Sequence, residues 1–320
     1  MKRELMGSIR RKLASSPEFF FAYRAYRAYR KSGKQAPGGQ NVDRLESARR
    51  LSLHAIVRRL STLSGFLFRQ YDFSDLLITR NGIFFRNPWG AFFAYLPAWG
   101  AYLAEFGELH EAEELLLLDS LLPEGGNLLD VGANVGTHSI NLACRRPDIR
   151  CFAFEPVPTT RGYLQANIEV NGLQDRIAVY GEALGEEEGE CRITVDQYTD
   201  NRLLTNSAAA PTSGASTMVR VTTLDQWHEQ EARPPISVLK MDVEGGELAA
   251  LKGAEALLKR ERPALLLEIV EEHLGRFGSS KRELFQWLSS IGYVARADQG
   301  GILPTNTLFV PSDGESGAKG

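Results

Sequence analysis

Short apolar runs alternate with longer amphipathic stretches between residues 127 and 269. The runs predict strands over 128–131, 150–154, 176–180, 236–241 and 264–269. The stretches between them repeat apolar residues at helical spacing and predict helices near 137–145, 158–171 and 246–260. Because strands that alternate with helices form βαβ units, the pattern predicts an α/β fold with a Rossmann-like, mostly parallel sheet.

Two further elements precede this alternation. Asn81-Gly82 lies between the apolar runs of 77–85, which predicts a hairpin with a tight turn. The leucine spacing over 108–122 predicts a helix, which the Pro and Gly residues after it would end.

Hairpin patterns also interrupt and close the alternation. Residues 190–195 and 218–221 predict two strands joined by the polar segment 198–217. Residues 291–294 and 307–310 predict an antiparallel pair at the end of the sheet.

The beginning of the chain differs in charge from the rest. The first 50 residues contain 13 Lys or Arg against four Asp or Glu, a balance of +9, although the whole chain carries −3. Three Ala-Tyr-Arg units over 22–30 would place tyrosines and arginines on neighbouring stripes of a helix. Residues 1–34 could contact an anionic membrane surface, or the extension could pack on the acidic body or a neighbouring subunit.

We therefore expect a helical N-terminal extension followed by the α/β domain. The expected regions are a basic extension over 1–70, a hairpin and aromatic-rich lead-in over 71–107, the main domain over 108–312 and a disordered tail over 313–320. The uncharged stretch 87–104 contains Gly and Pro, and we expect a cover or an interface there in preference to a membrane span. No signal peptide is visible, so the expected location is the cytoplasm, with peripheral membrane contact left open.

Composition excludes several classes of protein. The chain has 43% hydrophobic and 24% charged residues, which suits a globular fold with a sizeable core. Cys144, Cys151 and Cys191 lack metal-binding or paired spacing, so we interpret them as core thiols in a reducing compartment. The rest of the chain is acidic, and the basic extension lacks a recognisable nucleic-acid-binding motif. Both observations argue against nucleic acid as a partner.

The run from Leu128 to His138 predicts a strand that breaks into a glycine-rich turn and opens a helix, a pattern typical of nucleotide sites. Asp130 precedes Gly132, Asn134 and Gly136, and Glu155 follows 19 residues after the last glycine. The G-x-G-x-x-G fingerprint of nicotinamide sites is absent. An acid ahead of the glycines would repel a pyrophosphate and attract a cation, so the turn favours S-adenosylmethionine over a dinucleotide.

Charged residues also cluster where two later strands end. Lys240, Asp242 and Glu244 close the fourth parallel strand, and the two-residue period of a strand would place all three on one face. Glu268 ends the next strand, and His273 follows it. Ligands of open α/β sheets bind at these strand ends, so the cluster predicts proton-transfer groups, although a salt-bridged strand end would show the same residues.

In this order and spacing, these motifs resemble the FkbM type of class I S-adenosylmethionine-dependent methyltransferases. The resemblance covers about Glu108 to Ile269 and includes the segments 130–136, 154–156 and 240–245, with Glu182 to Gly185 between them. It implies a seven-stranded sheet whose C-terminal strand is antiparallel. It also implies methyl transfer to an oxygen, often on a sugar or a polyketide-like hydroxyl.

The resemblance further implies which residues surround the cofactor. The methionine half would lie against the first motif, the ribose against the end of the second strand and the adenine beside the third strand. These residues are Asp130, Gly132, Ala133, Asn134 and Gly136, then Glu155 and Pro156, then Glu182 and Ala183.

The expected function is O-methylation of a hydroxyl group on a small molecule, sugar or glycan. Asp242 or Glu244 would lie near the reacting oxygen with Lys240 as a positioning residue, and Glu268 or His273 would be the alternative base. Participation of Mg²⁺, the acceptor and the oligomeric state stay open. Two alternatives are a nicotinamide-dependent oxidoreductase and an inactive methyltransferase fold that docks other molecules through its basic N-terminus.

Overall fold

The computed structural model describes residues 76–79, 82–87, 89–93, 111–194, 203–204, 216–230, 234–296 and 305–312. All of them belong to one structural unit that spans residues 74–320. The predictions for the basic extension, for most of the lead-in and for the C-terminal tail lie outside the described residues.

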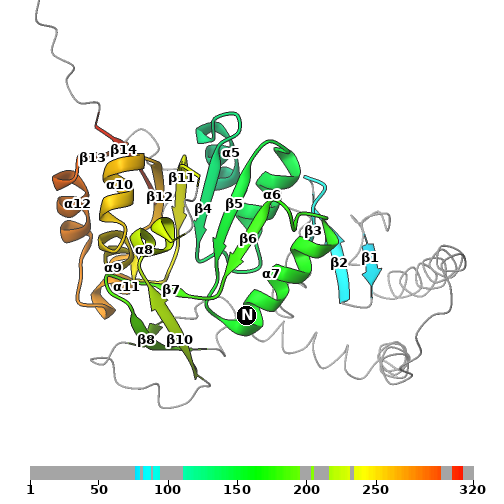
Figure 1. Ribbon diagram of the computed structural model, residues 1–320, viewed down its shortest axis with the longest axis horizontal. Coiled ribbons are helices and arrows are strands. Elements are labelled where there is room, and N and C mark those ends of the chain that lie inside the picture. The colour runs from blue at the N-terminus through cyan, green and yellow to red at the C-terminus, as the bar shows by residue number, and fades with distance from the viewer. Residues whose placement is uncertain are drawn as a thin grey trace, which may run out of the picture. The chain divides into compact units, whose positions relative to one another are not determined.

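A seven-stranded sheet forms the centre of this unit, in the order β13-β14-β12-β11-β4-β5-β6 (Figure 1). Five neighbouring strands are parallel: β12 (Ala264–Glu268), β11 (Val238–Met241), β4 (Asn127–Val131), β5 (Arg150–Phe154) and β6 (Ile177–Tyr180). At one edge, β14 (Asn306–Pro311) pairs antiparallel with β12, and β13 (Tyr293–Ala295) pairs antiparallel with β14. The predicted Rossmann-like sheet and its antiparallel end are confirmed.

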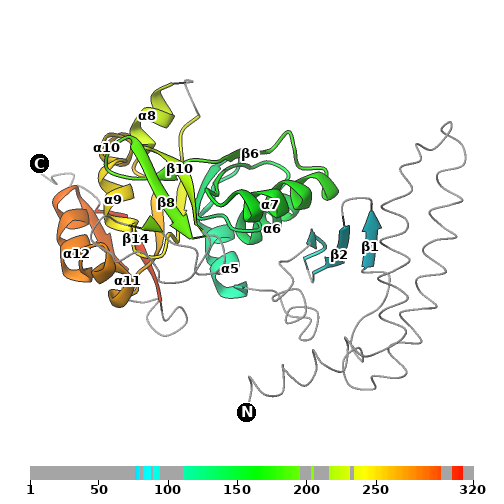
Figure 2. The same ribbon diagram turned by 90° about the horizontal axis from the view of Figure 1, so that it is seen from below.

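Two groups of helices cover the two faces of the sheet (Figures 1 and 2). One core packs side chains of α5 (Ala112–Leu121), α6 (Thr137–Arg145) and α7 (Pro158–Val170) against strand residues such as Leu128 and Ala153. The other core packs Leu129 and Phe154 against α8 (Leu224–Glu229), α9 (Glu247–Lys252), α10 (Glu255–Glu261), α11 (Glu271–Arg276) and α12 (Lys281–Ser290). Both faces of the central strands are buried, which explains why these strands appear in the sequence as continuous apolar runs.

The helix predicted near 246–260 is in fact two helices, α9 and α10. Gly253 ends α9, and a Cβ atom at this position would lie 2.0 Å from the carbonyl oxygen of Gly185. Only a residue without a side chain lets the backbone approach so closely. A contact distant in sequence therefore sets the break.

A smaller sheet, in the order β7-β10-β8-β9, lies at the carboxyl edge of the main sheet (Figure 1). Its strands are β7 (Ala183–Leu184), β8 (Gly189–Thr194), β9 (Leu203–Leu204) and β10 (Ser216–Thr222). The antiparallel pairing of β8 with β10 confirms the predicted hairpin. The two-residue strands β7 and β9 were not predicted, because so short a segment shows no periodicity.

The lead-in contains a three-stranded sheet of β1 (Leu76–Thr79), β2 (Gly82–Arg86) and β3 (Phe92–Phe93). The hairpin prediction is confirmed, but the pairing places Thr79 opposite Gly82, so the glycine belongs to β2 and not to the turn. Among the described residues, no helix is long and apolar enough to cross a membrane.

Candidate active site

A pocket opens where β4, β5 and β11 end and the smaller sheet begins. It is lined by Val131, Gly132, Asn134, Phe154, Glu155, Pro156, Val157, Thr160, Glu182, Ala183, Leu184, Ile193, Asp242, Val243 and Glu244. Carboxyl ends of parallel strands are the usual ligand edge of an open α/β sheet. The pocket contains six of the residues predicted to contact a cofactor, and two of those predicted to be catalytic.

The turn after β4 is held against the end of β11. Gly132 has a φ of +77°, and a Cβ atom there would lie 1.7 Å from the carbonyl oxygen of Asp242. Gly136 begins α6 with a φ of +96°, and its missing side chain makes room for Ile140 and Leu164. Gly132 therefore shapes the pocket wall, whereas Gly136 is a packing residue on the helix side. Ala133 is buried between them.

Asp130 lies at the base of this turn and is fully buried. Its Oδ2 accepts hydrogen bonds from the backbone N–H of Ser139 at 3.2 Å and from the Ser139 hydroxyl at 2.6 Å. Its Oδ1 is buried with no hydrogen-bond partner among the described residues. A buried acceptor of this kind carries a desolvation penalty until a donor reaches it, which fits the ammonium group of a bound cofactor.

Glu155 lies at the end of β5 and is also buried. Its two carboxylate oxygens accept hydrogen bonds from the backbone N–H groups of Asn134, at 3.0 Å, and Val157, at 2.8 Å. Burial raises the pKa of Glu155 to about 7, although these two donors favour the charged form. The donors fix the carboxylate at the pocket wall, where each oxygen retains a lone pair for a hydroxyl group.

Aromatic rings underlie the same wall. Phe154, which lines the pocket, stacks on Tyr180 with ring centres 4.9 Å apart. The Trp227 ring meets both Phe154 and Tyr180 edge to face, at 5.3 and 5.4 Å. The pocket floor is thus continuous with a packed aromatic cluster.

Lys240 is the buried cation of the site. It lies opposite Asp130 in the register of β11 with β4, and its Nζ is 3.6 Å from Oδ2 of Asp242. Burial alone would lower the pKa of Lys240, but the carboxylates of Asp242, Asp130, Glu111 and Glu268 raise it above its ordinary value. The ammonium group therefore stays charged and holds Asp242 at the pocket edge.

The predicted strand period does not explain the acids that follow Lys240. The strand β11 ends at Met241, and Glu244 lies in the turn beyond it with a φ of +57°. The turn still places both Asp242 and Glu244 at the pocket, whereas Lys240, which was predicted to share their face, is not among the lining residues. Glu247 is buried and accepts hydrogen bonds from the N–H groups of Val243 and Gly245, so it stabilises this turn.

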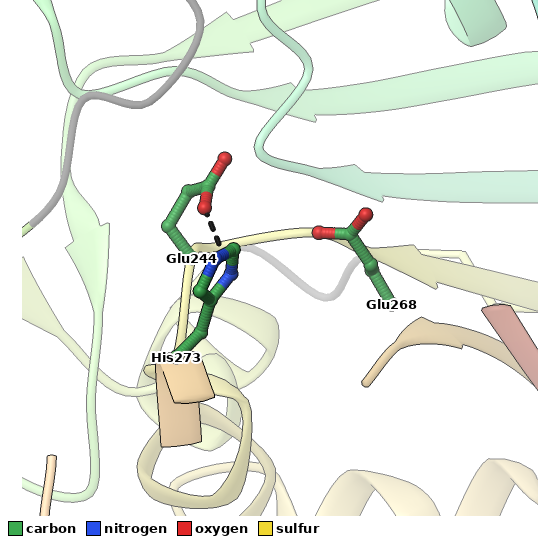
Figure 3. Close-up of side chains that lie close together, drawn as sticks. All are labelled: Glu244, Glu268 and His273. Carbon is green, nitrogen blue, oxygen red and sulfur yellow. Dashed lines mark ion pairs between the residues drawn. The ribbon is translucent and has the colours of Figure 1, made fainter. Parts of the chain in front are cut away.

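Glu244, Glu268 and His273 come together from the turn after β11, the end of β12 and the helix α11 (Figure 3). Oε2 of Glu244 lies 3.0 Å from Nδ1 of His273, and one ligand atom from each residue lies within 4.8 Å of the others. Gly245 permits this arrangement, since a Cβ there would lie 2.3 Å from the His273 carbonyl oxygen. Burial first, and then the charge of Asp242, raise the pKa of Glu268 to about 8.

Sequence reasoning did not identify Glu111. This residue immediately precedes α5 in a left-handed conformation, and its Oε2 lies 3.5 Å from Nε2 of His138. Burial raises the pKa of Glu111 to about 7, and its carboxylate interacts with the charges of Lys240, Asp242 and Asp130. Its sequence context showed only a helix start, so no local signal could reveal these contacts.

The family assignment follows from comparison with known proteins. The model of the methyltransferase FkbM domain matches residues 130–295, which is more than half of the chain. This chain belongs to the FkbM methyltransferase family. The resemblance inferred from the motifs is confirmed, and the family implies S-adenosylmethionine as the cofactor, not a nicotinamide.

Curated relatives of the FkbM chain have diverse names. The chain is 28% identical over 165 residues to the hexuronic acid methyltransferase AglP of Haloferax volcanii, covering 52% of the chain and 63% of AglP. It is 31% identical over 167 residues to ribosomal RNA small subunit methyltransferase G of Rhodococcus jostii, covering 50% of this chain and 62% of that protein. It is 27% identical over 224 residues to the AMB antimetabolite synthetase AmbE of Pseudomonas aeruginosa, covering 57% of this chain and 10% of AmbE. The chain thus spans less than two thirds of the length of each relative.

Among solved structures, an FkbM methyltransferase from Methylobacillus flagellatus KT is similar at 20% identity with a TM-score of 0.41. The similarity covers 66% of this chain and 52% of that one.

Proposed function

We propose that this FkbM protein is an S-adenosylmethionine-dependent O-methyltransferase that acts on a hydroxyl group of a sugar, a glycan or a related polar metabolite. The observation that carries the proposal is the convergence of proton-accepting groups beside the cofactor turn. Asp242 and Glu244 line the pocket, and Glu244 contacts His273 at 3.0 Å. An alcohol is a poor nucleophile, and a neighbouring base contributes typically 10²–10⁴-fold to its reactivity.

The geometry supports the binding roles that we propose. Asp130 offers its unpartnered Oδ1 to the methionine half, Glu155 offers its fixed carboxylate to the ribose, and Glu182 with Ala183 borders the adenine side. When bound, the cofactor supplies an electrophilic methyl group on a sulfonium. The protein aligns the acceptor oxygen with that methyl group and excludes water, an effect that can contribute about 7–11 kcal/mol.

The proton of the acceptor hydroxyl needs a base at the pocket edge. Asp242 or Glu244 would accept it, and Lys240 would position Asp242 through its 3.6 Å contact. Glu268 and His273 are the alternative acceptors, because both lie next to Glu244. Each of these roles is part of the proposal.

The residues that could hold a metal ion do not suit Mg²⁺. In the part of the chain that the structure describes, the candidate set is Glu244, Glu268 and His273, and it includes an imidazole nitrogen. Mg²⁺ prefers oxygen ligands in octahedral geometry, whereas imidazole suits transition metals. We therefore derive no step of methyl transfer through Mg²⁺.

A carbohydrate acceptor is supported by the name of the hexuronic acid methyltransferase relative. An RNA acceptor is the competing possibility, because other relatives are named as ribosomal RNA methyltransferases. The carboxylates that line the pocket would repel the phosphate groups of RNA, and they would repel a carboxylate of the acceptor too, so they favour methylation at an uncharged part of a carbohydrate.

The acceptor class is tested by incubating the full chain with labelled S-adenosylmethionine. Separate reactions contain glucuronic acid, a uronic-acid polysaccharide or ribosomal RNA, and products are analysed by mass spectrometry. We expect a gain of one methyl group on a carbohydrate hydroxyl. Methylation of RNA alone would contradict the carbohydrate acceptor, and methylation of a carbohydrate carboxyl group would contradict O-methylation of a hydroxyl. Glycans of a deletion strain should lack one methyl group.

The assignment of Asp242 is tested by Asp242→Ala and Asp242→Asn. We expect turnover to fall by about 10²–10⁴-fold, while binding of S-adenosylhomocysteine stays within a few-fold of the original protein. Asp175→Asn is the matched control, because Asp175 is exposed and lies outside the pocket. Near-normal turnover in both Asp242 variants would assign the proton transfer to another residue.

A further inference from the structure

A second carboxylate, that of Glu111, contacts the same turn of α6 that Asp130 contacts. Asp130 and Glu111 reach adjacent residues in the first turn of α6. Asp130 accepts two hydrogen bonds from Ser139, and Glu111 lies 3.5 Å from Nε2 of the neighbouring His138. Glu111 therefore approaches the end of β4 from a separate element, the start of α5.

Negative charges outnumber positive charges around Lys240. The charge of Lys240 interacts with those of Asp242, Asp130, Glu111 and Glu268, and its Nζ lies 3.6 Å from Oδ2 of Asp242. Asp130 and Glu111 also interact with each other as like charges, which disfavours the ionised form of Glu111. A second cation between Asp130 and Glu111 would relieve this repulsion.

The chemistry of that cation follows from the acceptors. Oδ1 of Asp130 is fully buried and has no partner among the described residues, so a donor from a ligand would satisfy it. An ammonium group has three N–H donors, more than Asp130 alone can satisfy. Glu111 can supply a further acceptor, and a bound cation would offset the desolvation that raises the pKa of this carboxyl.

We propose that Glu111 binds the α-ammonium group of the cofactor's methionine half, together with Oδ1 of Asp130. Glu111 lies before the segment matched by the FkbM family model, which begins at residue 130. The inference rests on the proposed cofactor site and adds a residue that the match of the family model does not include. Glu111 thus joins the start of α5 to the cofactor pocket.

Calorimetry on the full chain tests this role without an acceptor. The probes are S-adenosylhomocysteine, its analogue without the amino group, and 5′-methylthioadenosine, which lacks the whole amino-acid portion. For Glu111→Gln we expect S-adenosylhomocysteine to bind about tenfold or more weakly, as for the loss of a hydrogen bond between charged groups. The variant should bind the other two probes as tightly as the original protein does.

Glu113→Gln is the matched control, since Glu113 is exposed in the first turn of the same helix. It should leave the affinity for all three probes unchanged. Thermal unfolding of each variant without ligand shows whether the fold is intact, and Glu111→Asp offers a second, more conservative substitution.

Three results would overturn the assignment. Glu111→Gln could bind S-adenosylhomocysteine as tightly as the original protein, or it could weaken the binding of 5′-methylthioadenosine equally. The original protein could also fail to distinguish S-adenosylhomocysteine from the analogue without the amino group. Failure of the original protein to bind any of the three probes would instead remove the proposed cofactor site itself, and the role of Glu111 with it.

Discussion

Lys240 shows how a single residue can organise a site of opposite charge. Its side chain is almost completely buried, yet four carboxylates keep it ionised. A buried cation compensated in this way stabilises the fold only while its partners are present. The same ammonium group pairs with Asp242 at 3.6 Å, so the fold and the proposed chemistry share one side chain.

Lys240→Met should therefore destabilise the protein by about 3–5 kcal/mol, because it leaves buried carboxylates without a counter-charge. Chemical denaturation followed by circular dichroism measures this change. Lys252→Met is the matched control, since its 3.4 Å pair with Glu186 is on the surface and should change stability by at most about 0.5 kcal/mol. Equal effects of the two substitutions would show that the charges around Lys240 are already screened by solvent.

At the scale of elements, the contact between the ends of β4 and β11 decides the shape of the pocket. Gly132→Ala would place a methyl group against the carbonyl of Asp242, at 1.7 Å in the present backbone. We expect strong destabilisation and loss of S-adenosylhomocysteine binding, measured by thermal unfolding and calorimetry. Gly172→Ala is the control that separates backbone strain from steric overlap. Gly172 also has a positive φ, +66°, but a Cβ atom there would meet nothing within 4 Å. The control should lose only about 1–2 kcal/mol.

The elements that could be predicted from the sequence are those with a strong local pattern. The strands β4, β5, β6, β11 and β12 are apolar runs that pack into the cores on the two faces of the sheet, and their predicted positions agree with the structure to within two residues. The division of α9 from α10 could not be predicted, because Gly253 is constrained by the distant Gly185. The short strands β7 and β9 show no local pattern.

The candidate site also contains features that the sequence could predict and features that it could not. Its acids at strand ends could be identified, because each follows an apolar run and strand ends meet at one edge of the sheet. The contact of Glu244 with His273 could not be predicted, since it depends on the close approach of Gly245 to α11. Glu111 was missed for a related reason, because its partners lie on elements far along the chain.

At the scale of the whole molecule, buried carboxyl groups link stability to pH. Burial raises the pKa values of Glu111, Glu155 and Glu247 to about 7 and that of Glu268 to about 8, from an ordinary value of 4.5. The folded state therefore holds protons that the unfolded state releases between pH 4.5 and 8. In the absence of ligand, the free energy of unfolding should fall as pH rises through this window.

Urea denaturation at a series of pH values tests this expectation. The surface carboxyl of Asp148 acts in the opposite direction, because its hydrogen bond to Arg146 lowers its pKa below the ordinary 3.8. Its contribution is lost only at more acidic pH, outside the window. An unfolding free energy that rises between pH 5 and 8 would show that the four glutamates are ionised in the folded state throughout.

The aromatic cluster beneath the pocket offers an optical consequence. Phe154 borders the pocket, and its ring contacts the indole of Trp227 at 5.3 Å between ring centres. A purine that settles against this wall would change the environment through which the indole excited state relaxes. Intrinsic fluorescence should then report occupancy without any label, and Trp227→Phe should remove that component of the signal.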